Sequence, residues 1–502
     1  MPLREMKSWA RFSARVWSVS SSPSFEIVTI EASTPVALAD LVAVADGARL
    51  VIGAGVPEAL EAAATAAAEI AARTPTYGRS TGVGANRDTA VTEESDHGIR
   101  LVRSHATDAG APLPVRTVRA MIATRLAQLT RAGAGIEPAI VPALAEVLDR
   151  PRLPEIGSIG SIGTGDLAAL AALALIMAGE RGPAPATPVR WGVESALPFL
   201  SSSALTIGRA VLASDELRRL DRAGRVVFAL AATALRANPS AVSDAAAVAS
   251  AAPFVHDVSA EVRALRGSSG EPARIQDPFG LRVYPLTQGA LLTAVSRLDA
   301  QLLRLVNTAQ ENPVFDVAER IVTHHGSFFQ AQLAIDLDST ALAVAQSATN
   351  VHALLRLTNE PVFTGLRPFL ATGPAGASGL MMLEYTAAAA LAEIRNAATP
   401  ASLGTIALSR GTEEDASFAT QGAAQLERAV TSYRIVLACE SLAVSRLLSQ
   451  LDPDMPAALD DAAGMVRALQ PDQDDQELHG PLEQASGLLD ELARLIEPGV
   501  TG

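Results

Sequence analysis

The sequence predicts a mainly α-helical protein, a long-helix bundle with a smaller mixed α/β region towards the N-terminus. Two observations predict the bundle. Apolar residues recur every three or four positions over 291–305 and again over 426–447, which is the period of a helix with one buried face. Aromatic residues make up only 4% of the chain, and many stretches are rich in alanine. Small side chains of this kind let helices pack closely.

The N-terminal part is more varied. Residues 1–25 are rich in Ser and Arg and contain no apolar stretch typical of a secretory signal, so we expect a disordered tail. The apolar run at 50–55 predicts a strand, and the alanine-rich segment from about Pro57 predicts a helix. Residues 75–86, PTYGRSTGVGAN, have too many Gly, Ser and Thr for either element, and predict a loop.

The rest of the chain is predicted to form long helices. The apolar stripe over 291–305 predicts a helix that ends at Asn312-Pro313. A second stripe predicts a helix from about Gly422 to Leu451. We therefore expect an N-terminal region over 26–210 and a central and C-terminal helical bundle over 211–502.

Composition excludes several classes of function. The formal net charge is −14 and no basic stripe is present, which argues against nucleic acid or a membrane as partner and favours a cytoplasmic protein. Cys439 is the only cysteine, so a disulfide or Cys-rich zinc site is excluded, and no histidine pattern predicts a metal site. Lys7, the only lysine, lies in the N-terminal tail. Pyridoxal phosphate needs a buried lysine, so we expect no such cofactor.

Two short motifs offer alternatives. The GAG at 53–55 follows an apolar stretch, but Glu58 stands where a dinucleotide-binding turn has its third glycine. Residues 78–82 spell G-x-S-x-G around Ser80, the motif of a hydrolase nucleophile. That motif needs a strand before it and a helix directly after it, whereas a second Gly-rich turn follows here. A serine hydrolase is therefore a minor alternative.

The most distinctive segment is 157–180, GSIGSIGTGDLAALAALALIMAGE, a Gly/Ser/Thr-rich loop that runs into an apolar helix. We expect Thr164 or Asp166 at the N-cap. The segment resembles Gly-Ser-Val-Gly-Ala-Ser-Gly-Asp-Leu-Ala-Pro-Leu of the aromatic amino acid ammonia-lyase and aminomutase family, most closely its histidine ammonia-lyases. In that family Ala-Ser-Gly cyclises and loses two waters, giving the electrophile methylidene-imidazolone (MIO). The resemblance extends in order over about 33–450 and implies an ammonia-lyase-like helical bundle.

The same resemblance implies roles for individual residues. Tyr77, in YGRSTGVG, resembles the tyrosine of YGxNTGFG, the base that takes the β-proton. Arg282, in QDPFGLR, resembles the arginine that holds the substrate carboxylate. His105, in Ser-His-Ala, and Glu414, in Glu-Glu-Asp, resemble residues around the imidazole side chain in histidine-type members. The remaining residues that match substrate-binding motifs are Gln276, Asn312 and Phe328.

The departures from the family pattern surround the electrophile. Gly163-Thr164-Gly165 stands in place of Ala-Ser-Gly, and a ring formed from threonine would carry a methyl group on the carbon to which the amine adds. Ser201 replaces the family asparagine, and Phe279 replaces a tyrosine. We take Tyr77 with these five positions as the catalytic set.

Three readings remain open. In the first, an MIO-like ring forms from Gly163-Thr164-Gly165, and the protein is an ammonia-lyase or aminomutase for an α-amino acid with a polar or aromatic side chain, most consistently histidine. In the second, the same fold catalyses an elimination or addition without the ring, on a substrate with a better leaving group than ammonium. In the third, the homologue binds amino acids without catalysis. The resemblance also implies a homotetramer whose active sites combine residues of several subunits.

Overall fold

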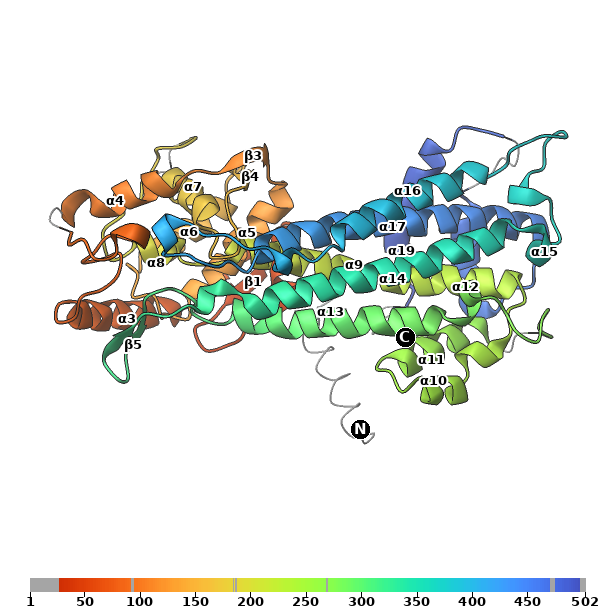
Figure 1. Cartoon of the computed structure of the whole chain (residues 1–502), viewed down its shortest axis with the longest axis horizontal. Helices are drawn as coiled ribbons and strands as arrows, with labels where there is room; N and C mark the ends of the chain where they lie inside the picture. Colours follow the sequence, from red (N-terminus) through yellow and green to blue (C-terminus); the bar gives the residue numbers. More distant parts are fainter. Residues whose placement is uncertain are drawn as a thin grey trace. The chain divides into compact units, whose positions relative to one another are not determined.

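The computed structural model describes most of the chain (Figure 1). The described residues are 27–91, 94–183, 185, 187–267, 270–469 and 475–496. The expected tail at 1–25 lies outside them. The remaining chain is mainly helical, with short strands confined to three two-stranded sheets among the described residues, which confirms the predicted fold class.

The chain forms two compact units, each assembled from separate segments. Unit 1 contains the residues up to 212 together with 298–337 and 400–424. Unit 2 contains 213–297, 338–399 and the residues from 425 onwards. The first division falls after Leu212, and two later segments return to unit 1. A single boundary along the sequence cannot divide the chain into these two units, because each of the longest helices has residues in both.

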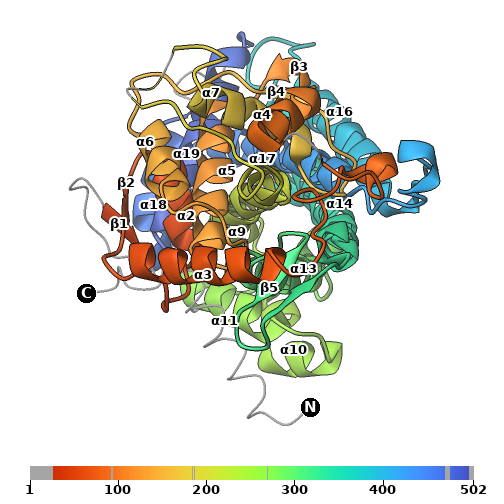
Figure 2. The same cartoon turned by 90° about the vertical axis from the view of Figure 1, so that its left-hand side faces the viewer.

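The N-terminal elements of unit 1 form a small α/β layer. Strands β1 (Ile27–Ile30) and β2 (Arg49–Ile52) pair in parallel, with α2 (Leu38–Ala45) between them in sequence. Helix α3 (Val56–Ala71) follows, as the alanine-rich segment predicts. In Figure 2, α3 runs beside β5 (Val314–Asp316), and its Ala67 and Ile70 pack on Phe315 of that strand.

The apolar helix of the distinctive segment lies in the core of unit 1. It is α7 (Leu167–Met177), and nine of its eleven residues are buried. Strands β3 (Ala109–Pro112) and β4 (Gly157–Ile159) pair just before it in an antiparallel ladder. The other elements of this unit are α4 (Glu94–His105), α5 (Val115–Leu129), α6 (Ile140–Leu148), α8 (Ala196–Leu200) and β6 (Ile321–Thr323).

The longest helices are α9 (Ala204–Ala234), α13 (Tyr284–Val306), α14 (Ala331–Asn359) and α17 (Ala419–Leu451). The apolar stripe predicted α17 well. Helix α13 ends at Val306, before the Asn312-Pro313 that was expected to end it. The intervening residues form an irregular segment that leads into β5, so proline marks the loop rather than the last helical turn.

In unit 2 the long helices pack through specific side-chain pairs. The ring of Phe228 on α9 stacks on Tyr284 of α13, with centroids 3.9 Å apart. The Ser347 hydroxyl on α14 lies 2.7 Å from the Tyr433 hydroxyl on α17. The shorter helices of this unit are α10 (Asp244–Ser250), α11 (Val255–Arg266), α12 (Phe279–Arg282), α15 (Pro361–Thr364), α16 (Met381–Ala397), α18 (Asp460–Arg467) and α19 (His479–Arg494).

One apolar segment among the described residues, Ala196–Ala234, is long enough and apolar enough to cross a membrane by length and composition. Its apolar window is 100% buried inside the protein. Burial on all sides is the pattern of a helix in a protein core, which has no need of a polar face.

Candidate active site

The loop after α3 holds Tyr77 in a defined position. The phenol oxygen of Tyr77 accepts a hydrogen bond from the Gly84 backbone N–H at 2.7 Å. The backbone N–H of Tyr77 donates to His324 Nε2 at 3.2 Å. Burial raises the pKa of Tyr77, as does the negative charge of Glu413, while the Gly84 N–H and Arg87 act in the opposite direction. The side chain is half-buried, so a substrate proton can reach a positioned phenol.

The turn over 408–413 is fastened to this loop. Ser409 Oγ accepts from the Ala85 N–H at 2.9 Å, and Arg87 Nη1 donates to Thr412 Oγ1 at 2.9 Å. Within the turn, the Leu408 N–H donates to the Glu413 carbonyl at 2.7 Å. These contacts hold Glu413 in a fixed relation to the tyrosine loop.

Glu413 also contacts the distinctive Gly-rich loop. The hydroxyl of Thr164 donates to Glu413 Oε2 at 3.1 Å. The backbone of the Gly-rich loop is strongly curved, with φ of +90° at Gly163 and +100° at Gly165. Both values lie where side chains other than glycine are strained. Ser417 Oγ donates to the Gly163 carbonyl at 2.9 Å, so the segment that precedes α17 also supports this loop.

Asp166 stands at the N-cap position of α7, as expected, but its side chain makes no capping hydrogen bond there. Its carboxylate instead accepts from the Thr206 N–H at 2.8 Å and from the Thr206 hydroxyl at 3.0 Å, in the first turn of α9. Asp166 therefore joins the starts of two helices. Burial raises its pKa, with the Thr206 hydrogen bonds opposing that effect.

The side chain of Ser201, at the C-terminal end of α8, is hydrogen-bonded within the protein. Its Oγ accepts from the Asn312 N–H at 2.9 Å. Asn312 Oδ1 in turn accepts from the His325 N–H at 2.9 Å. The structure thus brings Ser201 and Asn312 together, 111 positions apart in the sequence.

A buried ion pair holds the residue that precedes Asn312. Arg125 Nη1 donates to Glu311 Oε1 at 2.7 Å, and both side chains have no exposed surface. The guanidinium also donates to the carbonyl of Phe199 at 3.1 Å. Since Glu311 directly precedes Asn312, the pair fixes the position from which Asn312 reaches Ser201.

The two adjacent histidines turn to different neighbours, as their adjacency predicts. His324 Nε2 accepts from the Tyr77 N–H, so that nitrogen carries no proton. His325 Nδ1 accepts from the Ser327 N–H at 3.1 Å, which leaves Nε2–H to donate to the Glu311 carbonyl at 2.8 Å. Each ring therefore has one nitrogen that accepts a backbone hydrogen bond.

The residues expected around the substrate side chain are less tightly held. His105 ends α4, and its Nδ1 lies 2.8 Å from the Leu101 carbonyl, which leaves Nε2 as the acceptor nitrogen. Phe328 is half-buried in a short 3₁₀ turn, and Glu414 is exposed. Sequence reasoning assigned a site role to Glu414 and none to Glu413. The structure brings Glu413, rather than the exposed Glu414, to the Thr164 hydroxyl.

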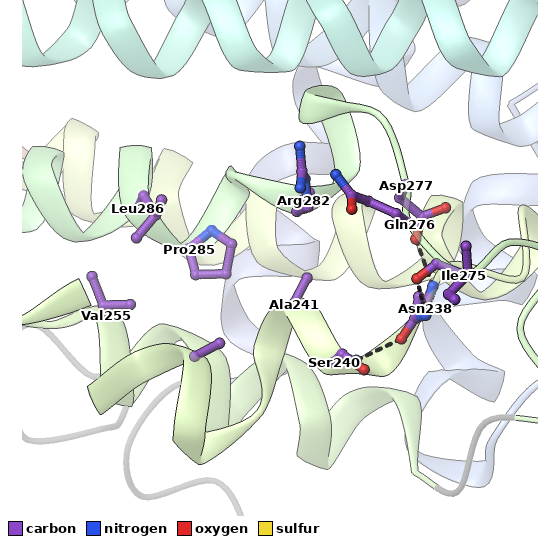
Figure 3. A pocket seen from close by; sticks show the side chains of 11 residues that line it. Asn238, Ser240, Ala241, Val255, Ile275, Gln276, Asp277, Arg282, Pro285 and Leu286 are labelled. Carbon is purple, nitrogen blue, oxygen red and sulfur yellow. Dashed lines mark hydrogen bonds between the residues drawn. The ribbon is translucent and has the colours of Figure 1, made fainter. Parts of the chain in front are cut away.

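Gln276, Phe279 and Arg282 belong to unit 2, whereas Tyr77 and Thr164 belong to unit 1. Gln276 and Arg282 line a cavity of about 330 Å³ in unit 2, shown in Figure 3. Its lining consists of Asn238, Ser240, Ala241, Ala246, Val255, Ile275, Gln276, Asp277, Arg282, Pro285 and Leu286.

Arg282 is the cation of this cavity. With its amide oriented to accept, Gln276 Oε1 receives hydrogen bonds from both Arg282 Nη atoms. The guanidinium lies over the Phe279 ring, 4.7 Å from its centroid, and Phe279 itself is 65% exposed. Arg282 Nε is buried and has no hydrogen-bond partner among the described residues.

Ser80 does not adopt the arrangement of a hydrolase nucleophile. Its Oγ accepts from the Thr76 N–H at 2.8 Å and donates to the Thr76 carbonyl at 3.2 Å. No regular strand precedes it and only a short 3₁₀ turn, Gly84–Asn86, follows. The Ser80 hydroxyl therefore stabilises the turn that contains it.

Comparisons with known proteins agree with this architecture. The family described as aromatic amino acid lyase matches residues 36–468. A probable histidine ammonia-lyase of Halobacterium salinarum is 29% identical over 527 aligned positions, covering 94% of this chain and 98% of that protein. The structure of histidine ammonia-lyase from Trypanosoma cruzi superposes with a TM-score of 0.86 at 22% identity, covering 94% of this chain and 96% of that one. The ergothioneine-degrading enzyme ergothionase from Treponema denticola gives 0.85 at 20% identity, covering 94% and 100%.

The fold is thus that of the ammonia-lyases and aminomutases, and the protein is a carbon–nitrogen lyase. The chain belongs to the aromatic amino acid lyase family. The resemblance found in its ordered motifs is confirmed.

The resemblance implies an MIO ring at Thr164 whose negative charge is stabilised by neighbouring groups. The residues around Thr164 do not fit such a ring. The Thr164 hydroxyl would have to leave, yet it donates to a carboxylate, which increases the electron density on its oxygen. Negative charge on a ring would develop beside that carboxylate, which opposes it. Ser201 Oγ is engaged by the Asn312 N–H, and Phe279 offers no hydroxyl.

Proposed function

We propose that the protein eliminates the amino group of an α-amino acid with an imidazole-type side chain, with Tyr77 as the base. The observation that carries this proposal is the hydrogen bond from the Gly84 N–H to the Tyr77 oxygen at 2.7 Å. A backbone donor at this place stabilises the phenolate, the form that accepts a proton. The histidine-type relatives and the Ser-His-Ala around His105 support the choice of side chain.

The Tyr77 phenolate takes a proton from the β-carbon of the substrate. The electron pair of that C–H bond forms the Cα–Cβ double bond, and the Cα–N bond breaks. The amine departs with its bonding electrons, and the product is an α,β-unsaturated carboxylate. Arg282 holds the substrate carboxylate through its fork, assisted by Gln276.

Arg282 and Tyr77 belong to different units of the chain. We propose that they meet in a homotetramer, in which each active site takes Tyr77 and Arg282 from different subunits. The cytoplasm is the compartment that we propose for this assembly, since the acidic chain carries a single, buried cysteine.

A second candidate follows from the contact between Thr164 and Glu413. Without an electrophilic ring, elimination is faster for a substrate whose nitrogen departs readily. A quaternary ammonium satisfies this, because it cannot lose its positive charge before the bond breaks and it leaves as a neutral tertiary amine. An imidazole-bearing betaine is therefore the alternative substrate, with Tyr77 and Arg282 in the same roles.

The experiment measures amine release by the full-length assembly from L-histidine, L-phenylalanine, L-tyrosine and Nα,Nα,Nα-trimethyl-L-histidine. Activity on any of these should be abolished in Tyr77→Phe and preserved in Tyr385→Phe, a matched control because Tyr385 is 63% exposed in unit 2. The substrate that releases amine separates the two candidates. Thr164→Ala separates a ring-dependent from a ring-independent reaction, and the contact of Thr164 with Glu413 predicts that this variant retains activity. If Tyr77→Phe retained full activity, the proposed elimination would be wrong. Absence of turnover combined with binding of L-histidine would favour the non-catalytic reading.

A further inference from the structure

The backbone N–H of Tyr77 donates to a side chain from a distant part of the chain. Its acceptor is His324 Nε2, 247 positions away in sequence and 3.2 Å from the Tyr77 nitrogen. Neighbouring N–H groups of the tyrosine loop bond within the loop, since Thr76 donates to Ser80 Oγ and Ser80 donates to the Thr76 carbonyl. The tyrosine is therefore attached to a second segment at its own backbone nitrogen.

The segment that carries His324 is a β-hairpin packed against helix α3. Strands β5 and β6 pair antiparallel, and His324 directly follows β6. Phe315 of β5 packs on Ala67 and Ile70, near the C-terminal end of α3. The tyrosine loop leaves α3 at the same end, so the loop and the hairpin are fastened to one packed cluster.

The backbone next to His324 is held as well. The His325 N–H donates to Asn312 Oδ1 at 2.9 Å, and the His325 ring donates to the Glu311 carbonyl at 2.8 Å. The imidazole of His324 is exposed, but its backbone is fixed by β6 on one side and by His325 on the other. His324 therefore presents Nε2 to the tyrosine loop from a rigid support.

We infer that His324 is a positioning residue of the base. By accepting the Tyr77 N–H it fixes the backbone end of that side chain, while the Gly84 N–H fixes the phenol end. The inference rests on the proposed function and adds a residue to it. The torsions between the backbone and the ring would otherwise let the phenol swing. With both ends bonded, the oxygen is held at one place relative to the β-carbon of the substrate, and proton transfer depends steeply on that placement.

The same hydrogen bond contributes little to stability. The contact between Tyr77 and His324 is exposed to solvent, and an exposed N–H that loses its acceptor bonds to water instead. His324 also lies outside the group that holds the substrate carboxylate, because Arg282 belongs to unit 2. Removal of the acceptor should therefore lower kcat, while KM and the thermal midpoint stay nearly constant.

The test uses two substitutions of His324 in the full-length assembly. His324→Leu removes the acceptor, whereas His324→Gln keeps one, because the amide oxygen of glutamine is as many bonds from the backbone as Nε2. The values of kcat and KM are measured for amine release from L-histidine and from Nα,Nα,Nα-trimethyl-L-histidine, and the thermal midpoint of each protein is recorded. His479→Leu is the matched control, because the His479 side chain is 76% exposed on α19 in unit 2. Tyr77→Phe, which lacks the base, is measured in parallel.

In His324→Leu we expect kcat to fall roughly tenfold or more, with KM changed by less than about twofold and the thermal midpoint close to that of the parent. His324→Gln should keep kcat within about threefold of the parent, because it retains the acceptor although it lacks the ring. A role of the imidazole in packing alone would not give this rescue. His479→Leu should leave kcat, KM and the thermal midpoint unchanged.

The outcome for Tyr77→Phe distinguishes failure of this inference from failure of the proposed function. If Tyr77→Phe is inactive, the role of His324 alone would be overturned by an unchanged kcat in His324→Leu, by an equal loss in His324→Gln, or by a rise in KM at constant kcat. Full activity of Tyr77→Phe would overturn the proposed base and the positioning role with it. Absence of amine release by the parent from both substrates would overturn the proposed function together with the role of His324.

Discussion

The hydroxyl of Thr164 donates a hydrogen bond to the carboxylate of Glu413 across 249 positions of sequence. Thr164 stands where the resemblance places a serine that loses its hydroxyl. In this chain that hydroxyl is held by an anion, and threonine is more crowded than serine.

This contact predicts that Thr164 remains chemically intact. Loss of its hydroxyl would leave the Glu413 carboxylate without its donor and beside a ring that must accept negative charge. High-resolution mass spectrometry of the peptide that spans 163–165 should give the mass of the unmodified sequence. A deficit of two waters located at these residues would contradict this prediction and establish a threonine-derived ring.

The pH dependence of the reaction should report Tyr77. Burial and the charge of Glu413 raise the pKa of its phenol, and the phenolate is the reactive form, so kcat/KM should rise with pH on the alkaline side. Replacing Glu413 by Gln removes a negative charge near the phenol and should move this limb to lower pH. The check is a kcat/KM profile of both proteins at constant ionic strength. A limb that moved to higher pH in Glu413→Gln would contradict the electrostatic account.

The Gly-rich loop should tolerate no side chain at Gly163. A Cβ there would lie 2.4 Å from Ser417 Oγ and 2.7 Å from the Ala419 N. Gly376 is a matched control, because its φ of +91° is almost equal to the +90° at Gly163 and nothing lies within 4 Å of an added Cβ.

Both alanine variants incur the strain of a positive φ, which is about 1–3 kcal/mol. Only Gly163→Ala must also displace the start of α17, so its thermal midpoint should fall further and its amine release should be lost. If the two variants had equal thermal midpoints and activities, the close contact at Gly163 would have no consequence.

The sequence predicts the elements of this protein better than its contacts. The apolar stripe over 426–447 and the loop composition of 75–86 are local patterns, and the structure has a helix and a loop there as expected. The sequence predicts Thr164 or Asp166 at the N-cap of α7, and the structure has Asp166 there, yet its carboxylate binds the start of α9. That choice depends on where Thr206 lies after folding, and no local pattern contains this information. The role of Glu413 was missed for a related reason, because only the fold places it against Thr164.

The ion pair of Arg125 and Glu311 should matter for the site through Asn312. Arg125→Met leaves the Glu311 carboxylate buried without its cation, which typically costs about 3–5 kcal/mol. The double variant Arg125→Met/Glu311→Leu removes both charges, and we expect it to be more stable than the single variant. Thermal midpoints of the two variants and the parent provide the check. A double variant less stable than Arg125→Met would show that the pair is not the dominant interaction there.

In unit 2, Glu440 should make stability depend on pH. Its side chain is fully buried on α17, and its Oε1 accepts from the Thr358 hydroxyl at 3.1 Å. Burial raises the pKa of Glu440 from 4.5 to about 8, with the Thr358 hydrogen bond opposing the shift. Between these two pH values the folded chain holds a proton that the unfolded chain has lost. Unfolding therefore releases a proton, and the stability contributed by this group falls as the pH rises.

Glutamine at position 440 cannot ionise, so Glu440→Gln should remove this loss, which amounts to on the order of 3 kcal/mol between pH 5 and pH 8. The thermal midpoint of the variant minus that of the parent should therefore increase as the pH rises through this range. Glu491→Gln is the matched control, because Glu491 is an exposed carboxylate on α19 in the same unit. It should leave the pH dependence of the parent unchanged. If Glu440→Gln and the parent kept a constant difference in thermal midpoint from pH 5 to pH 8, Glu440 would be ionised in the folded protein throughout. The buried carboxylate would then require a cation close to it in the core of unit 2.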